Sequence, residues 1–102
     1  MKIYIAGKVT GLSNYKEIFD KARENLEDKG HQVLSPSILP IGFDYEDYMK
    51  ICFSMINVCD AIYFLPNWVE SEGATREINY ATATGKHFEF VNYEGEIYVW
   101  EF

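Results

Sequence analysis

The chain has 102 residues, a length that predicts one domain, spanning 1–102, around a single hydrophobic core. Its formal net charge of −7 argues against binding of a nucleic-acid polymer, although backbone amides at a helix N-terminus can still hold one small anion. No apolar run is long enough to cross a bilayer, and a strand predicted directly after Met1 leaves no room for a signal peptide, so we expect a cytoplasmic protein without membrane contact.

The first part of the sequence predicts a strand, a helix and a second strand. Lys2–Ala6 has the apolar character of a strand buried on both faces. Asn14–Lys29 predicts an amphipathic helix that ends at Gly30, and Gln32–Leu34 predicts the next strand. Apolar residues recur every fourth position in the helix, at Ile18, Ala22 and Leu26.

The middle of the chain predicts a loop, a helix and a strongly apolar strand. Ser35–Asp44 contains two prolines and a glycine and is long enough to lie over a site. Tyr45–Asn57 predicts the second helix, and Asp60–Leu65 predicts the third strand. The apolar side of this helix carries Tyr48, Met49, Cys52, Met55 and Ile56.

The last part predicts a helix at Glu72–Thr84, ended by Gly85, and strands at His87–Asn92 and Glu96–Glu101, the latter at an edge. Strands that alternate with helices favour a parallel sheet covered on both faces. The expected fold is therefore a three-layer αβα, Rossmann-like (flavodoxin-like) domain with a central, mostly parallel sheet of four to five strands.

The aromatic fraction of 17% is high for so small a domain. Aromatic surface that the core cannot hold would be buried in a homodimer, whereas a bulky aromatic core explains the same composition without one. Both interpretations remain open at this point.

The cysteines and histidines give no metal-binding pattern. Cys52 and Cys59 lie in one apolar helical stretch without a CxxC motif, so we expect reduced core thiols. His31 and His87 have no second ligand at metal spacing. No metal or other cofactor is expected.

Two short segments carry the chemistry: the run from Tyr4 to Gly11, and the run from Ser71 to Glu77. In the first, glycines follow a strand, where backbone N–H groups can approach a ligand closely. The second opens a helix and places a carboxylate four residues after Gly73. Ligands bind at the carboxyl ends of parallel strands, so the two segments together predict a small-ligand pocket with Glu77 as candidate nucleophile. The alternative is an ordinary strand-to-helix turn plus a solvated helix glutamate.

The motifs Tyr4-Ile5-Ala6-Gly7-x-Val9-Thr10-Gly11, Cys59-Asp60-Ala61-Ile62 and Gly73-x-x-x-Glu77 resemble the nucleoside 2-deoxyribosyltransferase superfamily. The match is to its small branch of uncharacterised domains, related to the 2′-deoxynucleoside 5′-phosphate N-hydrolases. The resemblance covers nearly the whole chain in order and spacing.

This resemblance implies a role for each site residue. Glu77 would attack or stabilise the anomeric carbon while the N-glycosidic bond breaks, and Tyr4 would lie beside that carboxylate. Ser71 would bind phosphate, and it is also suited to cap the third helix. The other implied substrate-binding residues are Gly7, Lys8, Val9, Thr10, Asn67 and Gly73.

Two positions depart from the family pattern. The family commonly has a proton-transferring aspartate eight residues before the one that matches Asp60, and this chain has Cys52 there. A thiol is a poor general acid unless its pKa is perturbed, and Asp47 lies more than one helical turn away. Lys8 stands where close relatives carry proline, and its cation would favour a more highly charged ligand.

Three functions follow. The first is an enzyme, a hydrolase (N-glycosidase) or deoxyribosyltransferase, acting on a deoxynucleoside or its 5′-monophosphate, with Glu77, Tyr4 and Cys52 at the catalytic positions. The second is a nucleotide-binding module, catalytically weakened by Cys52, that senses or sequesters its ligand. The third is a structural or interaction protein that docks a partner through aromatic surface. In the first two, the partner is a small nucleoside or nucleotide, and related enzymes complete their sites as homodimers.

Overall fold

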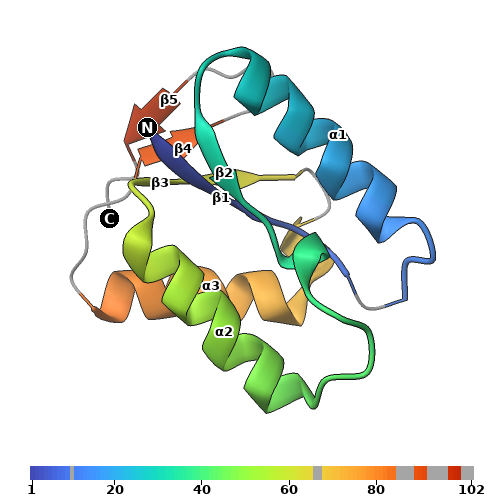
Figure 1. Ribbon diagram of the computed structural model, residues 1–102. Helices are drawn as coiled ribbons and strands as arrows, with labels where there is room; N and C mark the ends of the chain where they lie inside the picture. The colour runs from blue at the N-terminus through green and yellow to red at the C-terminus, as the bar shows by residue number, and fades with distance from the viewer. Residues whose placement is uncertain (10, 66–67, 85–88, 92–96, 100–102) are drawn as a thin grey trace.

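The computed structural model describes residues 1–9, 11–65, 68–84, 89–91 and 97–99 (Figure 1). Its centre is a sheet of three parallel strands in the order β2 (Gln32–Leu34), β1 (Lys2–Ala6), β3 (Ala61–Phe64). Beside β3 lie β4 (Glu89–Val91), which is parallel to it, and β5 (Ile97–Val99), which pairs antiparallel with β4 at the edge. The predicted α/β fold with a parallel sheet is confirmed.

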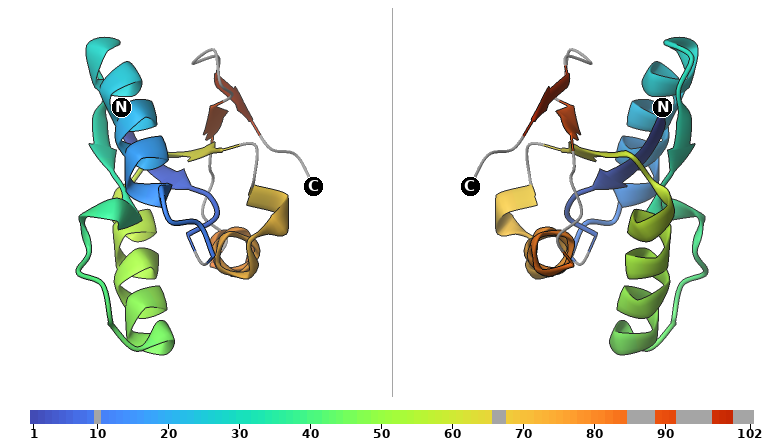
Figure 2. Two further views of the ribbon diagram at one scale, coloured as in Figure 1. Left: turned by 90° about the vertical axis from the view of Figure 1, so that its right-hand side faces the viewer. Right: turned by 90° about the vertical axis from the view of Figure 1, so that its left-hand side faces the viewer.

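Three α-helices in the described part of the chain cover the sheet: α1 (Tyr15–Asp28), α2 (Tyr45–Val58) and α3 (Glu72–Ala83). Helix α1 packs on one face, and α2 and α3 pack on the other, next to one another (Figure 2). The chain leaves β1 through α1 on one face and reaches β3 through α2 on the opposite face. The chain thus adds strands first to one side of β1 and then to the other. In open α/β sheets the crevice between two such neighbouring strands, here β1 and β3, is the usual place for a ligand.

Strand β1 divides the core in two because its side chains alternate between the faces. Ile3 and Ile5 pack with α1, whereas Tyr4 and Ala6 pack with α2 and α3. All four side chains are buried, as expected for a central strand covered by helices on both sides. The strand thus places Tyr4 on the same face as the helix that carries Glu77.

The end of α1 follows the sequence closely. Gly30 has a φ of +93°, a conformation that residues with a Cβ rarely adopt. Its N–H donates to the carbonyl of Glu27 at 2.9 Å, and the N–H of His31 donates to that of Leu26 at 3.2 Å. These two bonds form a Schellman motif, which satisfies carbonyls at the end of the helix. The predicted stop at Gly30 is confirmed.

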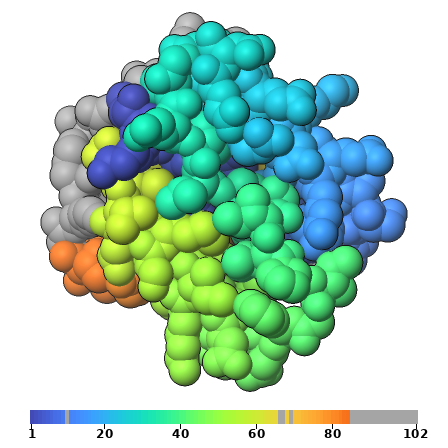
Figure 3. Space-filling model, in the orientation of Figure 1, coloured from blue at the N-terminus to red at the C-terminus, as the bar shows by residue number. Residues whose placement is uncertain are grey.

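Several boundaries differ from the predicted ones by one or a few residues. Helix α2 continues to Val58, and the loop 35–44 contains a 3₁₀ turn, η1 (Pro36–Ile38). Ser35 begins this turn, because its Oγ accepts a hydrogen bond from the N–H of Ser37 at 3.2 Å. Figure 3 shows the green loop on the surface, between the blue residues near α1 and the yellow-green α2. The predicted stop at Gly85, and the ends of the last two predicted strands, lie outside the described residues.

The two cysteines are buried, reduced thiols, as predicted, with Cys52 inside α2 and Cys59 at its C-terminal end. Over the described ranges, no helix is both long enough and apolar enough to cross a membrane.

Candidate active site

A pocket of about 830 Å³ opens at the carboxyl ends of β1 and β3. Its volume lies within the range of about 300–1,000 Å³ that is typical of small-molecule sites. The walls come from the residues after β1, the loop 35–44, the first turns of α2 and α3, and the turn η2 (Trp68–Glu70). The predicted loop over a site is therefore part of this pocket, at the position where doubly wound sheets bind ligands.

The pocket brings together most of the residues that the sequence singles out. Those that line it are Gly7, Lys8, Val9, Ser71, Gly73 and Glu77. Tyr4 and Cys52 do not line the pocket but are fully buried beside Glu77, and each influences the ionisation of its neighbours. Thr10 and Asn67 lie outside the described residues.

Glu77 is buried, with only 5% of its surface exposed. It lies in the second turn of α3, on the side that also buries Ala74, Ile78 and Ala81. Burial raises the pKa of the carboxyl from 4.5 to about 8, and Tyr4 opposes part of this rise. The alternative interpretation of Glu77 as a solvated glutamate on the helix surface is therefore wrong. With this pKa, Glu77 is mainly protonated at pH 7.

Three groups with raised pKa values surround this carboxyl: Tyr4, Tyr48 and Cys52. Burial and the neighbouring Glu77 raise the pKa values of the Tyr4 and Tyr48 phenols above the ordinary value of a tyrosine. The same two causes raise the pKa of the Cys52 thiol to about 12. The hydroxyls of Tyr4 and Tyr48 and the Oε2 atom of Glu77 are buried, and none makes a hydrogen bond of ordinary geometry within the described structure. Buried polar atoms normally have a partner, so Tyr48 and Glu77, which line the pocket, are free to hydrogen-bond a ligand there.

The N-terminus of α3 is built as predicted. Ser71 adopts an extended backbone conformation, and its Oγ accepts a hydrogen bond from the N–H of Ala74 at 3.0 Å. Its carbonyl accepts a further bond from Thr75 N–H at 3.1 Å. A Cβ built on Gly73 would meet its nearest neighbours at 3.7 Å, which is an ordinary van der Waals contact. The pocket wall therefore has room for a small side chain at this position.

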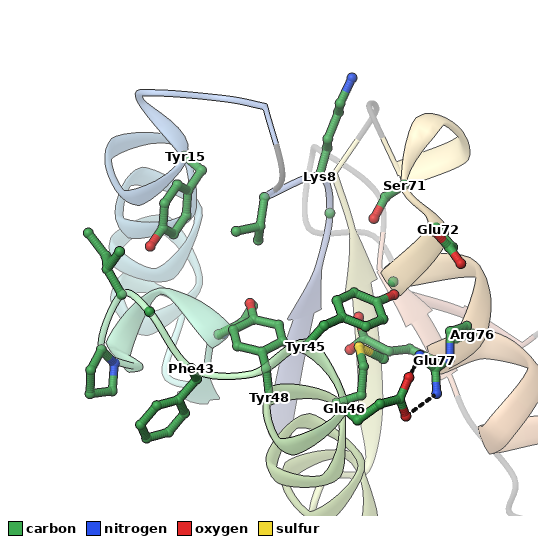
Figure 4. Close-up of a pocket in the computed structure, with 18 of the residues that line it drawn as sticks. Lys8, Tyr15, Phe43, Tyr45, Glu46, Tyr48, Ser71, Glu72, Arg76 and Glu77 are labelled. Carbon is green, nitrogen blue, oxygen red and sulfur yellow. Dashed lines mark hydrogen bonds and ion pairs between the residues drawn. The ribbon is translucent and has the colours of Figure 1, made fainter.

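Aromatic rings form the wall opposite α3. Figure 4 shows Tyr15 from α1, Phe43 from the loop, and Tyr45 and Tyr48 from α2, all on the rim or wall of the pocket. Phe43 and Tyr45 are exposed by 47% and 38%. Flat aromatic walls suit the stacking of a planar ligand. The sequence placed Tyr48 on the buried side of its helix, but gave no signal for Tyr15 or Phe43, whose place depends on how α1 and the loop pack.

Two ion pairs lie at the rim. Arg76 donates to both carboxylate oxygens of Glu46, at 2.9 and 3.2 Å, and so joins α3 to α2. The guanidinium also lies 5.3 Å from the centre of the Tyr45 ring, and it holds the pKa of Glu46 below its ordinary value. Lys8 pairs with Glu70 at 3.7 Å. Arg76 does not stand out in the sequence as a site residue, and its place directly before Glu77 is the one feature that could have marked it.

A metal site is not seen in the parts of the chain that are described: no three His, Cys, Asp or Glu side chains gather there as metal ligands would. The pocket instead combines one buried carboxyl, a polar helix start, aromatic walls and paired charges. Such a site can hold a planar polar ligand and place a carboxylate against it.

Solved structures with known activities share this fold. A 2-deoxyribosyltransferase from Bacillus psychrosaccharolyticus matches with a TM-score of 0.66 and 24% identity, over 95% of this chain and 76% of its own. A 2-deoxyribosyltransferase from Leishmania mexicana matches with a TM-score of 0.65 and 25% identity, over 99% and 79%. The CMP N-glycosidase BcmB of Clostridium botulinum matches with a TM-score of 0.55 and 23% identity, over 90% and 71%.

These likenesses confirm the resemblance to the nucleoside 2-deoxyribosyltransferase fold over nearly the whole chain. Among proteins with curated functions, none matches the sequence. A family model described as "Domain of unknown function (DUF4406)" matches residues 1–90. The chain therefore belongs to the DUF4406 family, whose fold it shares with 2-deoxyribosyltransferases and a nucleotide N-glycosidase.

Proposed function

We propose that this protein cleaves or transfers the N-glycosidic bond of a deoxynucleoside or its 5′-monophosphate, with Glu77 as the reacting carboxylate. The observation that carries the proposal is the position of Glu77. It is a nearly fully buried carboxyl with one unpaired oxygen, and it lines a ligand-sized pocket at the carboxyl ends of a parallel sheet. The order β2-β1-β3-β4-β5, which is that of flavodoxin-like Rossmann folds, supports this choice of site.

The reaction needs a carboxylate next to the anomeric carbon of the sugar. An oxygen of ionised Glu77 bonds to the anomeric carbon while the N-glycosidic bond breaks, and the electron pair of that bond leaves with the base. The transition state has oxocarbenium character, so a negative charge beside it lowers its energy. Water in a hydrolase, or a second base in a transferase, then releases the sugar from Glu77. No metal or organic cofactor enters these steps.

The ionisation of Glu77 sets the pH dependence of this chemistry. Because its pKa is about 8, the fraction of reactive carboxylate rises with pH and reaches one half near pH 8. We expect base release to rise from pH 6 to pH 8 with it.

A second candidate is a nucleoside- or nucleotide-binding module that lacks turnover. The departing base needs a proton, and the groups around Glu77 are poor donors: the Cys52 thiol has a pKa of about 12, and burial raises those of both tyrosines. This observation favours binding without efficient catalysis. The homodimer and the cytoplasmic location expected from the sequence are compatible with both candidate functions.

Two parallel measurements test the proposal. The protein is incubated with each of the four common 2′-deoxynucleosides and their 5′-monophosphates, and free base is separated by chromatography. A thermal-shift series with the same compounds detects binding. Release of base supports the enzyme, and stabilisation without release supports the binding module. If no compound is cleaved and none raises the Tm, both candidates are wrong.

A further inference from the structure

The two cations that line the described part of the pocket, Lys8 and Arg76, each already pair with a carboxylate of this chain. Glu70 lies 3.7 Å from the Lys8 ammonium, and Glu46 binds both outer nitrogens of Arg76 at 2.9 and 3.2 Å. Figure 4 shows Lys8 extending away from Glu77, so its ammonium lies at the mouth and not over the buried carboxyl. The Lys8 cation, which the sequence predicts to favour a more highly charged ligand, thus already has a carboxylate partner.

A third exposed carboxylate that lines the pocket lies at the start of α3. Glu72 lines the pocket in the first turn of α3, and Ser71 uses its Oγ as the acceptor for the Ala74 N–H. A helix N-terminus favours one negative charge nearby, and Glu72 supplies that charge from within the chain. Two cations therefore face three exposed carboxylates at the rim, on a protein whose formal net charge is −7.

A phosphate dianion entering this pocket would meet repulsion or would have to break an ion pair. Breaking the bidentate Arg76–Glu46 pair would leave Glu46 beside the phosphate, and releasing Lys8 would do the same with Glu70. A nucleoside carries no charge at neutral pH and meets neither cost. Its hydroxyls and base edges can pair with the unpartnered oxygen of Glu77 and the buried hydroxyl of Tyr48.

Resting on the proposed function, we propose that the ligand of this pocket is a nucleoside without a 5′-phosphate, selected because the rim of the pocket is acidic and its cations are paired. Glu70 and Glu46 act as specificity-determining residues: each occupies a cation that a phosphate would need. The selection works by excluding charge and leaves recognition of the base and sugar to the inner wall.

The test compares Kd values for a 2′-deoxynucleoside and its own 5′-monophosphate, measured by titration calorimetry at low and at higher ionic strength. We use the four common 2′-deoxynucleosides. The wild-type protein is expected to bind at least one nucleoside about five-fold or more tightly than its monophosphate at low salt, since about 1 kcal/mol of repulsion corresponds to that factor. Added salt screens the repulsion, so the ratio of the two Kd values falls towards one.

Two variants separate the role of Glu70 from that of total charge. Glu70→Gln removes the carboxylate that pairs with Lys8 and is expected to shift the ratio of Kd values towards the monophosphate by about three-fold or more. Glu27→Gln removes the same charge and also breaks an ion pair, with Arg23 at 3.1 Å, but Glu27 does not line the pocket. This control is expected to leave the ratio within experimental error of the wild type.

Tighter binding of the monophosphate by wild type overturns this inference and leaves the proposed function standing. An unchanged ratio in Glu70→Gln, or the same shift in Glu27→Gln, overturns it as well. If neither the nucleosides nor the monophosphates bind, the proposed function fails and the inference fails with it.

Discussion

Glu77 shares its surroundings with Tyr4, Tyr48 and Cys52, whose protons stay bound at neutral pH. Within this group, Glu77 is the one whose pKa, about 8, lies near physiological pH. A change of one pH unit there alters its charge substantially, whereas the phenols and the thiol stay neutral. At the scale of single residues, the charge of this buried cluster is therefore set by Glu77.

The raised pKa of Glu77 predicts how stability depends on pH. The folded protein holds the Glu77 proton up to about pH 8, whereas the unfolded chain releases it near 4.5. Between these values the folded state binds more protons, so this group makes the free energy of unfolding fall as pH rises, by a few kcal/mol, on the order of 1.4 per pKa unit.

Glu77→Gln keeps the shape of the side chain and cannot titrate. Urea unfolding of both proteins at pH 5.5 and pH 8.5 checks the prediction, because contributions from other groups cancel in the difference. Wild type is expected to lose stability relative to Glu77→Gln at the higher pH. A difference that does not change with pH would mean that Glu77 has an ordinary pKa.

Substitution of Cys52 tests the missing proton donor. Cys52→Asp would place a carboxyl group among the hydroxyls of Tyr4 and Tyr48, which have no partner of ordinary geometry in the described structure and can donate to it. If the protein is an enzyme limited by proton transfer to the base, we expect faster base release, by about ten-fold or more. Cys52→Ser is the matched control: it is similar in size but is no better acid, and it should bring no gain. Equal rates for both variants would contradict a role in proton transfer.

Helix α3 brings the pocket-lining residues of its first two turns into place, and its start depends on Ser71. Ser71→Ala removes the oxygen that accepts the Ala74 N–H, and the expected loss in free energy of unfolding is about 1 kcal/mol. Ser71→Asp supplies another capping oxygen and should retain most of the stability. Urea denaturation of the wild type and both variants measures these free energies of unfolding, and the m value is expected to stay unchanged. Equal losses in the two variants would show that the cap is not what stabilises the helix.

At the scale of elements, the sequence predicted most of the fold because its signals are local. The apolar run at β1 and the apolar residues at every fourth position of α1 can be recognised from neighbouring residues alone. The same is true of the end of α1 at Gly30. The pairing of Arg76 with Glu46 joins residues thirty positions apart and depends on the packing of α2 against α3. Such contacts leave no periodic trace in a sequence. For the same reason the burial of Glu77 could not be distinguished beforehand from a solvated position.

At the scale of the whole molecule, several large apolar side chains are exposed near the pocket. Ile41 is 80% exposed, Ile38 63% and Phe43 47%, all within or beside the loop 35–44. A neighbouring subunit would bury such surface. This loop surface favours a homodimer, which stays a prediction, and packing through α2 and α3 is expected from the sequence alone. Light scattering at micromolar concentration should give about twice the chain mass of 11.9 kDa. A mass equal to one chain would contradict it.

Base release by wild type and by variants of Glu77 shows most directly whether this carboxylate reacts. Wild type should release free base from at least one 2′-deoxynucleoside, and Glu77→Ala should lower the rate about 10²-fold or more. Glu77→Gln should still bind that nucleoside while losing turnover, and Glu24→Gln, an exposed glutamate on α1, should behave as wild type. Base release by Glu77→Ala at the wild-type rate would contradict the central claim, because the carboxylate placed in the pocket would then not take part in the reaction.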